Sequence, residues 1–126
     1  MISLCLGLAG VVWAQLPLAG FTLGWTHTIE KIRWEEDYLV IPQGLQLVEA
    51  RVRGTGAGMD IPEDAVLENG SWRYRPTLPA LQPLSLARTP EAGDYQLCFE
   101  GSCHAMSRWA GPPDARQAFM QLWSCG

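Results

Sequence analysis

The chain has 126 residues, the length of one domain, and its formal net charge at neutral pH is −4. Its eight arginines and single lysine are spread along the chain, so it lacks the basic stripe that nucleic-acid binding requires. The 13 glycines and nine prolines favour short strands joined by turns over long helices.

The chain begins with an uncharged apolar segment over residues 2–21. Ile2–Ala14 has the length of the hydrophobic region of a secretory signal peptide, with possible cuts after Ala14 or Gly20. The whole segment is also long enough to cross about 30 Å of hydrocarbon as an uncleaved helix. A buried helix of a cytosolic protein is the third alternative.

These alternatives define the expected domains. We predict a signal peptide or membrane-anchor helix over residues 1–20, followed by an exported domain over residues 21–126. The domain is then periplasmic, either soluble or anchored to the inner membrane by residues 2–21.

Strand periodicity begins immediately after the apolar segment. Phe21–Thr28 alternates large apolar with small or polar residues, which predicts the first strand of the domain. The alternation resumes at Ile32 and continues to Val40. The acidic residues 35–37 interrupt it, and we predict a turn or bulge there between two strands.

The next predicted strand is Leu45–Arg53, followed later by Leu84–Ala87. Strict alternation in the first of these places Ala50 and Val52 on one face and Leu45 and Leu47 on the other. The proline-spaced residues 76–83 are predicted to form an extended segment that covers the sheet or lies at its edge.

Two dipeptides, Asn69-Gly70 and Glu100-Gly101, predict two-residue hairpin turns. The second turn places Cys98 opposite Cys103 in a non-hydrogen-bonded pair, with Cα atoms about 4.5 Å apart. A disulfide can bridge that distance, so we predict a structural Cys98–Cys103 bond. A redox role for this bond stays open as the alternative.

The C-terminal residues predict a helix. Asp114–Ser124 carries five apolar residues at the spacing i, i+3, i+4, i+7 and i+8, which forms one apolar stripe. Cys125 can pair with Cys5 only if the leader is retained, and we do not expect that pairing.

These elements predict an all-β fold. We expect a small antiparallel sandwich or flattened barrel of seven or eight short strands, with a C-terminal helix and a preceding apolar leader or anchor helix.

The cluster of histidine and acids is formed by His27, Glu30 and Glu36. Three such side chains can hold a divalent ion, but a continuous strand would place His27 and Glu30 on opposite faces. A half-buried histidine, with glutamates solvated or paired to arginines, is the structural alternative. We predict no catalytic residue, no resident metal and no cofactor. A metal-dependent or hydrolytic enzyme at this cluster is the alternative function.

Residues 54–59 contain three glycines, at positions 54, 56 and 58. Successive backbone N–H groups of such a loop can hold an anion, and an ordinary flexible loop is the alternative. No GK[ST] follows, so the segment does not match a phosphate-binding loop.

Several short motifs occur in a fixed order. They are F-T-L-x-W-T-H-T-x-E, then W-E-E, G-T-G-A-G-M and C-x4-C before R-W. Together they resemble the DUF1850 family of small uncharacterised bacterial proteins, commonly encoded beside TAXI-type TRAP transporters. The resemblance covers roughly Phe21 to Trp109, and Thr28 stands where serine is more usual.

The resemblance implies a context and no established activity. We expect a non-enzymatic binding or accessory module of a TRAP transporter at the periplasmic face. Its expected partners are the transporter membrane subunits or the solute-binding protein, and also the membrane if the leader is uncleaved; nucleic acid is not expected. The expected binding residues are His27, Thr28, Glu30, Glu36, Gly56, Gly58 and Met59.

Overall fold

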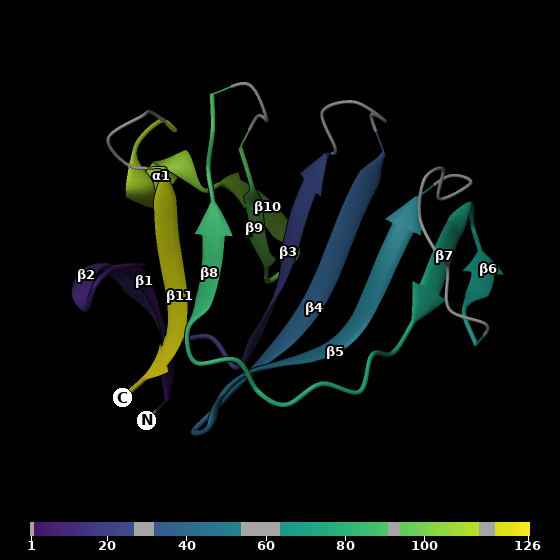
Figure 1. The fold of residues 1–126 in the computed structure, drawn as a ribbon, viewed down its shortest axis with the longest axis horizontal. Coiled ribbons are helices and arrows are strands. Elements are labelled where there is room, and N and C mark those ends of the chain that lie inside the picture. Colours follow the sequence, from purple (N-terminus) through teal and green to yellow (C-terminus); the bar gives the residue numbers. More distant parts are fainter. Residues whose placement is uncertain (1, 27–31, 54–63, 91–93, 114–117) are drawn as a thin grey trace.

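The computed structural model describes residues 2–26, 32–53, 64–90, 94–113 and 118–126. Its strands form two antiparallel sheets that share one hydrophobic core (Figure 1). This arrangement is consistent with the predicted all-β sandwich. The described residues contain eleven strands, where we predicted seven or eight.

The two sheets differ in size. In spatial order, the smaller sheet consists of β2 (Val11–Leu16), β1 (Ser3–Leu8), β11 (Phe119–Cys125) and β8 (Leu84–Ala87). The larger sheet consists, in spatial order, of β10 (Ser102–Ala105), β9 (Gln96–Phe99), β3 (Gly20–Thr26), β4 (Arg33–Ile41), β5 (Gly44–Arg53), β7 (Ser71–Tyr74) and β6 (Val66–Glu68). A short helix, α1 (Ser107–Ala110), follows β10.

The core lies between the smaller sheet and one face of the larger sheet, which we call the inner face. Leu4, Leu6 and Leu122 contribute to the core from the smaller sheet, and Leu23 and Leu97 from the larger sheet. All five side chains are at most 1% exposed. Full burial of a leucine stabilises a fold by roughly 1.5–3 kcal/mol, so this contact holds the two layers together.

Three hairpin turns share the same backbone conformation. Both central residues have positive φ at Ala9-Gly10, Asn69-Gly70 and Glu100-Gly101, as a type I′ turn requires. The predicted turns at Asn69-Gly70 and Glu100-Gly101 are therefore confirmed. The Ala9-Gly10 turn lies inside the segment for which we predicted a helix.

The apolar residues 2–21 do not form the predicted leader or anchor helix. They form the β1–β2 hairpin and the beginning of β3. The physical reason is that both Leu4 and Leu6 are buried in the shared core, and the Ala9-Gly10 turn reverses the chain between the strands. Within the described residues, no helix is both long and apolar enough to cross a membrane.

The pairing of Cys5 with Cys125 is a second correction. The two cysteines form a disulfide with an S–S distance of 2.06 Å and a Cα–Cα distance of 6.0 Å. The antiparallel pairing of β1 with β11 brings them together, because it sets Ser3 opposite Cys125 and Cys5 opposite Trp123. A cut after Ala14 or Gly20 would remove β1 together with Cys5.

The predicted C-terminal helix over Asp114–Ser124 is also replaced by a strand. Residues 114–117 lie outside the described residues, and β11 begins at Phe119. Alternate residues of β11 are buried, namely Met120, Leu122 and Ser124. The apolar residues of this segment fit both the stripe of a helix and the alternation of a strand. The segment becomes a strand because it pairs with β1 on one side and with β8 on the other.

A β-bulge corrects the predicted faces of β5. Asp37 pairs with Glu49 but Tyr38 pairs with Leu47, so Val48 is an extra residue without a partner on β4. Leu45, Leu47, Ala50 and Val52 consequently all lie on the inner face and are buried. The predicted interruption at residues 35–37 is wrong: these residues are regularly paired within one continuous β4, and the bulge follows Asp37 with its extra residue on β5.

The proline-spaced segment crosses from the larger sheet to the smaller one, below β5 in the view of Figure 1. Leu81 exchanges two backbone hydrogen bonds with Leu45, at N···O distances of 2.8 and 2.9 Å. The segment thus covers the end of the sheet, as the prediction for residues 76–83 stated.

Candidate binding site on the inner face

Of the seven predicted binding residues, Glu36 is the one that the structure describes. His27, Thr28, Glu30, Gly56, Gly58 and Met59 lie outside the described residues. Thr26, the last residue of β3, pairs with Arg33, and Trp34 pairs with Val52 near the end of β5. The described residues that flank the predicted segments are therefore at the same end of the sheet.

Glu36 lies on the inner face of β4, in a row that is otherwise free of charge. Its direct neighbours across the sheet are Leu23 on β3 and Ala50 on β5, each 1% exposed. The row continues to Leu97 on one side and to Tyr74 on the other. A carboxyl group thus occupies a position where the fold elsewhere places leucine or alanine.

Aromatic residues form the neighbouring row, closer to the end of the sheet. Trp25 and Trp34 are cross-strand partners and their rings stack, with centroids 5.9 Å apart. Tyr95 packs against Trp25, with ring centroids 5.7 Å apart. Trp25, Trp34, Glu36 and Tyr95 are all partly exposed, so this part of the inner face is not closed by the smaller sheet.

The hydroxyl of Tyr38 donates a hydrogen bond to Glu36 Oε1 at 2.9 Å. Burial raises the pKa of Glu36, and this hydrogen bond lowers it by less. Burial and the charge of Glu36 also raise the pKa values of Tyr38, Tyr74 and Tyr95. Glu36 is therefore the source of a negative potential felt by three phenol groups.

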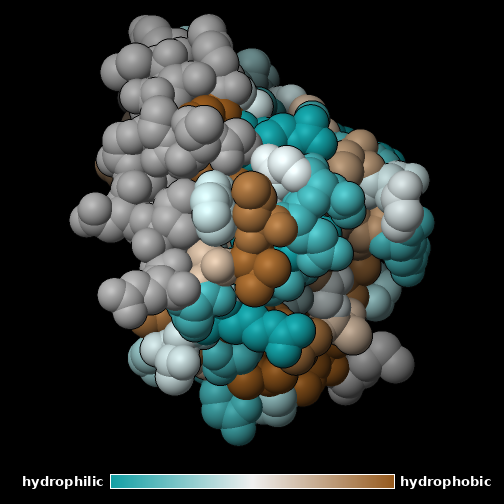
Figure 2. Space-filling view, turned by 90° about the vertical axis from the view of Figure 1, so that its right-hand side faces the viewer, coloured by the Kyte–Doolittle hydropathy of each residue, from teal (hydrophilic) through white to brown (hydrophobic). Residues whose placement is uncertain are grey.

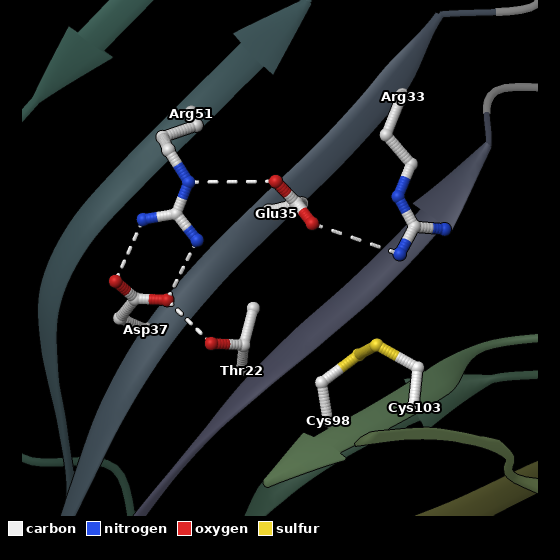
Figure 3. The surroundings of a disulfide bond; sticks show 7 residues. All are labelled: Thr22, Arg33, Glu35, Asp37, Arg51, Cys98 and Cys103. Atoms are coloured by element: carbon white, nitrogen blue, oxygen red, sulfur yellow. Dashed lines mark hydrogen bonds and ion pairs between the residues drawn. A yellow bond between two sulfur atoms is a disulfide. The ribbon is translucent and has the colours of Figure 1, made fainter. Parts of the chain in front are cut away.

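The outer face of the same strands carries a different set of charges (Figure 3). Arg51 donates hydrogen bonds to both carboxylate oxygens of Asp37, at 2.6 and 2.8 Å, and forms ion pairs with Glu35 and Glu49. Arg33 forms an ion pair with Glu35 at 3.7 Å. The predicted structural alternative, glutamates paired with arginines, applies to Glu35. These cross-strand pairs stabilise the sheet and leave no free cation among them.

The predicted Cys98–Cys103 disulfide is confirmed. The two residues are direct partners in the β9–β10 hairpin, with Cα atoms 4.0 Å apart. A surface groove of about 490 Å³ lies beside it, lined in part by Thr22, Asp37 and Phe99. Thr22 donates to Asp37 at 2.7 Å, so these two polar groups of the groove are bonded to each other.

Metal binding finds no support among the residues that the structure describes, because they contain no group of three histidines, cysteines or acids in reach of one ion. The predicted alternative at His27, Glu30 and Glu36 involves two residues beyond them. That alternative stays a prediction.

The sequence contained evidence that Glu36 faces inward, but the interpretation of residues 35–37 as a break left that evidence unused. Trp34, Glu36, Tyr38 and Val40 follow one alternation, so Glu36 belongs to the face of the aromatic residues. Treating residues 35–37 as a break removed Glu36 from that series. The participation of Tyr74 and Tyr95 had no local signature, because their approach depends on strand pairing.

Comparison with known proteins gives one result. The family described as a domain of unknown function, DUF1850, matches residues 21–106. No curated protein and no solved structure matches the chain. The match covers more than half of the chain and contains Glu36 and the aromatic residues around it, whereas β1, β2 and β11 lie outside it. The chain therefore belongs to the DUF1850 family.

Proposed function

We propose that this protein is a non-enzymatic binding module that serves a TRAP-type transporter at the periplasmic face, with its site at Glu36. The observation that carries the proposal is the partly exposed carboxyl group on the inner face, beside stacked tryptophans. The resemblance to proteins encoded beside TAXI-type TRAP transporters supplies the transporter.

A purely structural role does not explain Glu36. Burying a carboxylate costs free energy unless a cation or several donors compensate it, and Tyr38 is its hydrogen-bond partner among the described residues. An amide would accept the same hydrogen bond without the charge. A charged group at a costly position is typical of a binding or catalytic site.

Binding is favoured over catalysis by the neighbours of Glu36. They are aromatic rings and phenol groups, with no described nucleophile or second acid hydrogen-bonded to Glu36. The family match indicates no enzymatic family.

The two disulfides indicate an oxidising compartment outside the cytoplasm. This supports the periplasmic placement in the proposal. The membrane subunits of the transporter and its solute-binding protein are the proposed partners.

Co-purification tests the association. The full-length chain with a C-terminal tag is expressed beside its neighbouring transporter genes, and the captured proteins are identified from solubilised membranes. We expect the transporter membrane subunits to be recovered with the unmodified chain. Recovery should fall several-fold with Glu36→Gln if the transporter subunit contacts the carboxylate that we propose as the site.

Glu35→Gln is the matched control, since Glu35 is the neighbouring acid on the outer face. It should leave the recovery unchanged. Capture of the unmodified chain without any transporter subunit would refute the transporter association. Equal recovery with Glu36→Gln would show that the transporter subunits bind to another surface of the protein.

A further inference from the structure

We infer that the group recognised at Glu36 is a small organic cation, of the ammonium or quaternary ammonium class. This inference deepens the proposed function, because it rests on the same site and names the class of ligand. Three features carry it: a carboxylate with no ion-pair partner among the arginines around it, aromatic rings beside it, and few oxygen ligands for a metal ion among the residues that the structure describes.

The first feature is the charge. Three arginines on these strands, Arg33, Arg51 and Arg73, pair with acids on the outer face. Arg88 is 1% exposed and bonds to Asp94 at 3.0 Å. None of these four arginines is bonded to Glu36, whose hydrogen-bond partner among the described residues is Tyr38. A ligand with a positive charge gains from this carboxylate, and an anionic ligand is repelled by it.

The second feature is the row of rings beside Glu36. Trp34 is two residues before Glu36 on the same face of β4, about 6.6 Å away along the strand. Trp25 and Tyr95 extend the aromatic surface across β3 and towards β9. A cation over a tryptophan face gains about 0.5–2 kcal/mol, and more of this is realised when the site is desolvated.

The third feature is the small number of oxygen ligands among the described residues, which favours an organic cation over a bare metal ion. Calcium takes six to eight oxygen ligands and magnesium six. Among the described residues, the site offers one carboxylate, phenol groups and the carbon surfaces of aromatic rings. An alkylated ammonium group suits this mixture, because its methyl or methylene groups contact rings while its charge faces the carboxylate.

The experiment measures binding by the purified full-length protein. Isothermal titration is carried out with choline, tetramethylammonium and putrescine. The uncharged control is 3,3-dimethylbutan-1-ol, which has the shape of choline without its charge. We expect at least one cation to bind, and choline to bind at least tenfold more tightly than its uncharged isostere if it is that cation.

The variants locate the site. Glu36→Gln should weaken cation binding at least tenfold, and Trp34→Leu should weaken it while keeping an apolar side chain. Glu35→Gln on the outer face should bind as the unmodified chain does. Circular dichroism confirms that each variant is folded.

Two results would overturn the inference: no binding of any of the three cations, or equal binding by the Glu36→Gln variant. Neither result bears on the transporter, because the co-purification contains no added cation. Conversely, cation binding by a protein that captures no transporter subunit would keep the inference and refute the association.

Discussion

At the scale of single residues, adjacent acids on β4 have opposite electrostatic environments. Glu36 faces inward, where burial raises its pKa. Burial also raises the pKa of Asp37, but the hydrogen bonds from Arg51 and Thr22 outweigh this effect, so the pKa of Asp37 is lowered. Asp37 therefore stabilises the fold above its unfolded pKa, and this contribution is lost as pH falls through its lowered folded value.

The stability contributed by Glu36 depends on pH in the opposite direction, which leads to a prediction for Glu36→Gln. Its folded pKa is raised, so the fold loses stability as pH rises from the unfolded pKa through the folded one. At pH 7 the variant should be more stable by about 1 kcal/mol, the low end of the cost of burying a polar group. The advantage should vanish below about pH 4. Urea unfolding between pH 3.5 and 7.5 measures it.

Glu35→Gln serves as the control for this experiment. It removes a charge that pairs with Arg33 and Arg51 on the outer face, so it should not stabilise the protein. A Glu36→Gln variant that is less stable at every pH would show that the carboxylate is compensated in the folded protein.

At the scale of elements, the local sequence determines where the hairpins turn, whereas strand pairing determines which face each side chain of a strand occupies. The turns at Asn69-Gly70 and Glu100-Gly101 depend on two residues each, and both were predictable. The faces of β5 depend on the bulge at Val48, which arises only when β5 pairs with β4. A shift of one residue exchanges the faces of a strand, so alternation alone placed half of β5 wrongly.

The disulfide of the β9–β10 hairpin gives the prediction at this scale. It closes a loop from Cys98 to Cys103, five residues apart in sequence, so the entropic gain is at the low end of the disulfide range. The double variant Cys98→Ser, Cys103→Ser should lose about 2 kcal/mol and stay folded. Thermal and urea unfolding measure the loss.

The unmodified protein under reducing conditions is not a clean control, because both disulfides respond to it. Oxidised Gly101→Ala is better, since it strains the same turn, where φ is 81°, without removing the bond. A double cysteine variant that fails to fold would mean that the bond is required to form the hairpin.

At the scale of the whole molecule, the two ends of the chain hold the second layer together. β1 pairs with β11 along five residue pairs, and the Cys5–Cys125 disulfide joins them across 120 residues of sequence. Figure 1 shows the two termini side by side at one end of these strands. Figure 2 shows the opposite side of the molecule, where β6 and β7 form the edge and hydrophilic residues lie to the right of and below a narrow apolar strip.

Deletion of residues 1–20 tests how much the fold depends on β1. Loss of the Leu4 and Leu6 side chains alone should cost about 4–10 kcal/mol, comparable with the whole stability of a domain. The fragment 21–126, with Cys125→Ser, should therefore not unfold cooperatively. Calorimetry and binding of a hydrophobic dye measure this.

The full-length double variant Cys5→Ser, Cys125→Ser is the control, because it removes the disulfide and keeps β1. It should unfold cooperatively at a lower temperature, with a loss of up to about 5 kcal/mol. A cooperatively folded fragment 21–126 would instead support the prediction that residues 1–20 are a removable leader.

The amino-acid sequence by itself determined the local structure: the all-β class, the two I′ turns and the Cys98–Cys103 bond, because each depends on residues a few positions apart. The tertiary structure decided whether apolar segments become helices or strands. The terminal segments fit either pattern, and pairing of β1 with β11 across the length of the chain selects the strand. The same holds for the site: Glu36 is visible in the sequence, but only the tertiary structure brings Trp25, Tyr74 and Tyr95 near it.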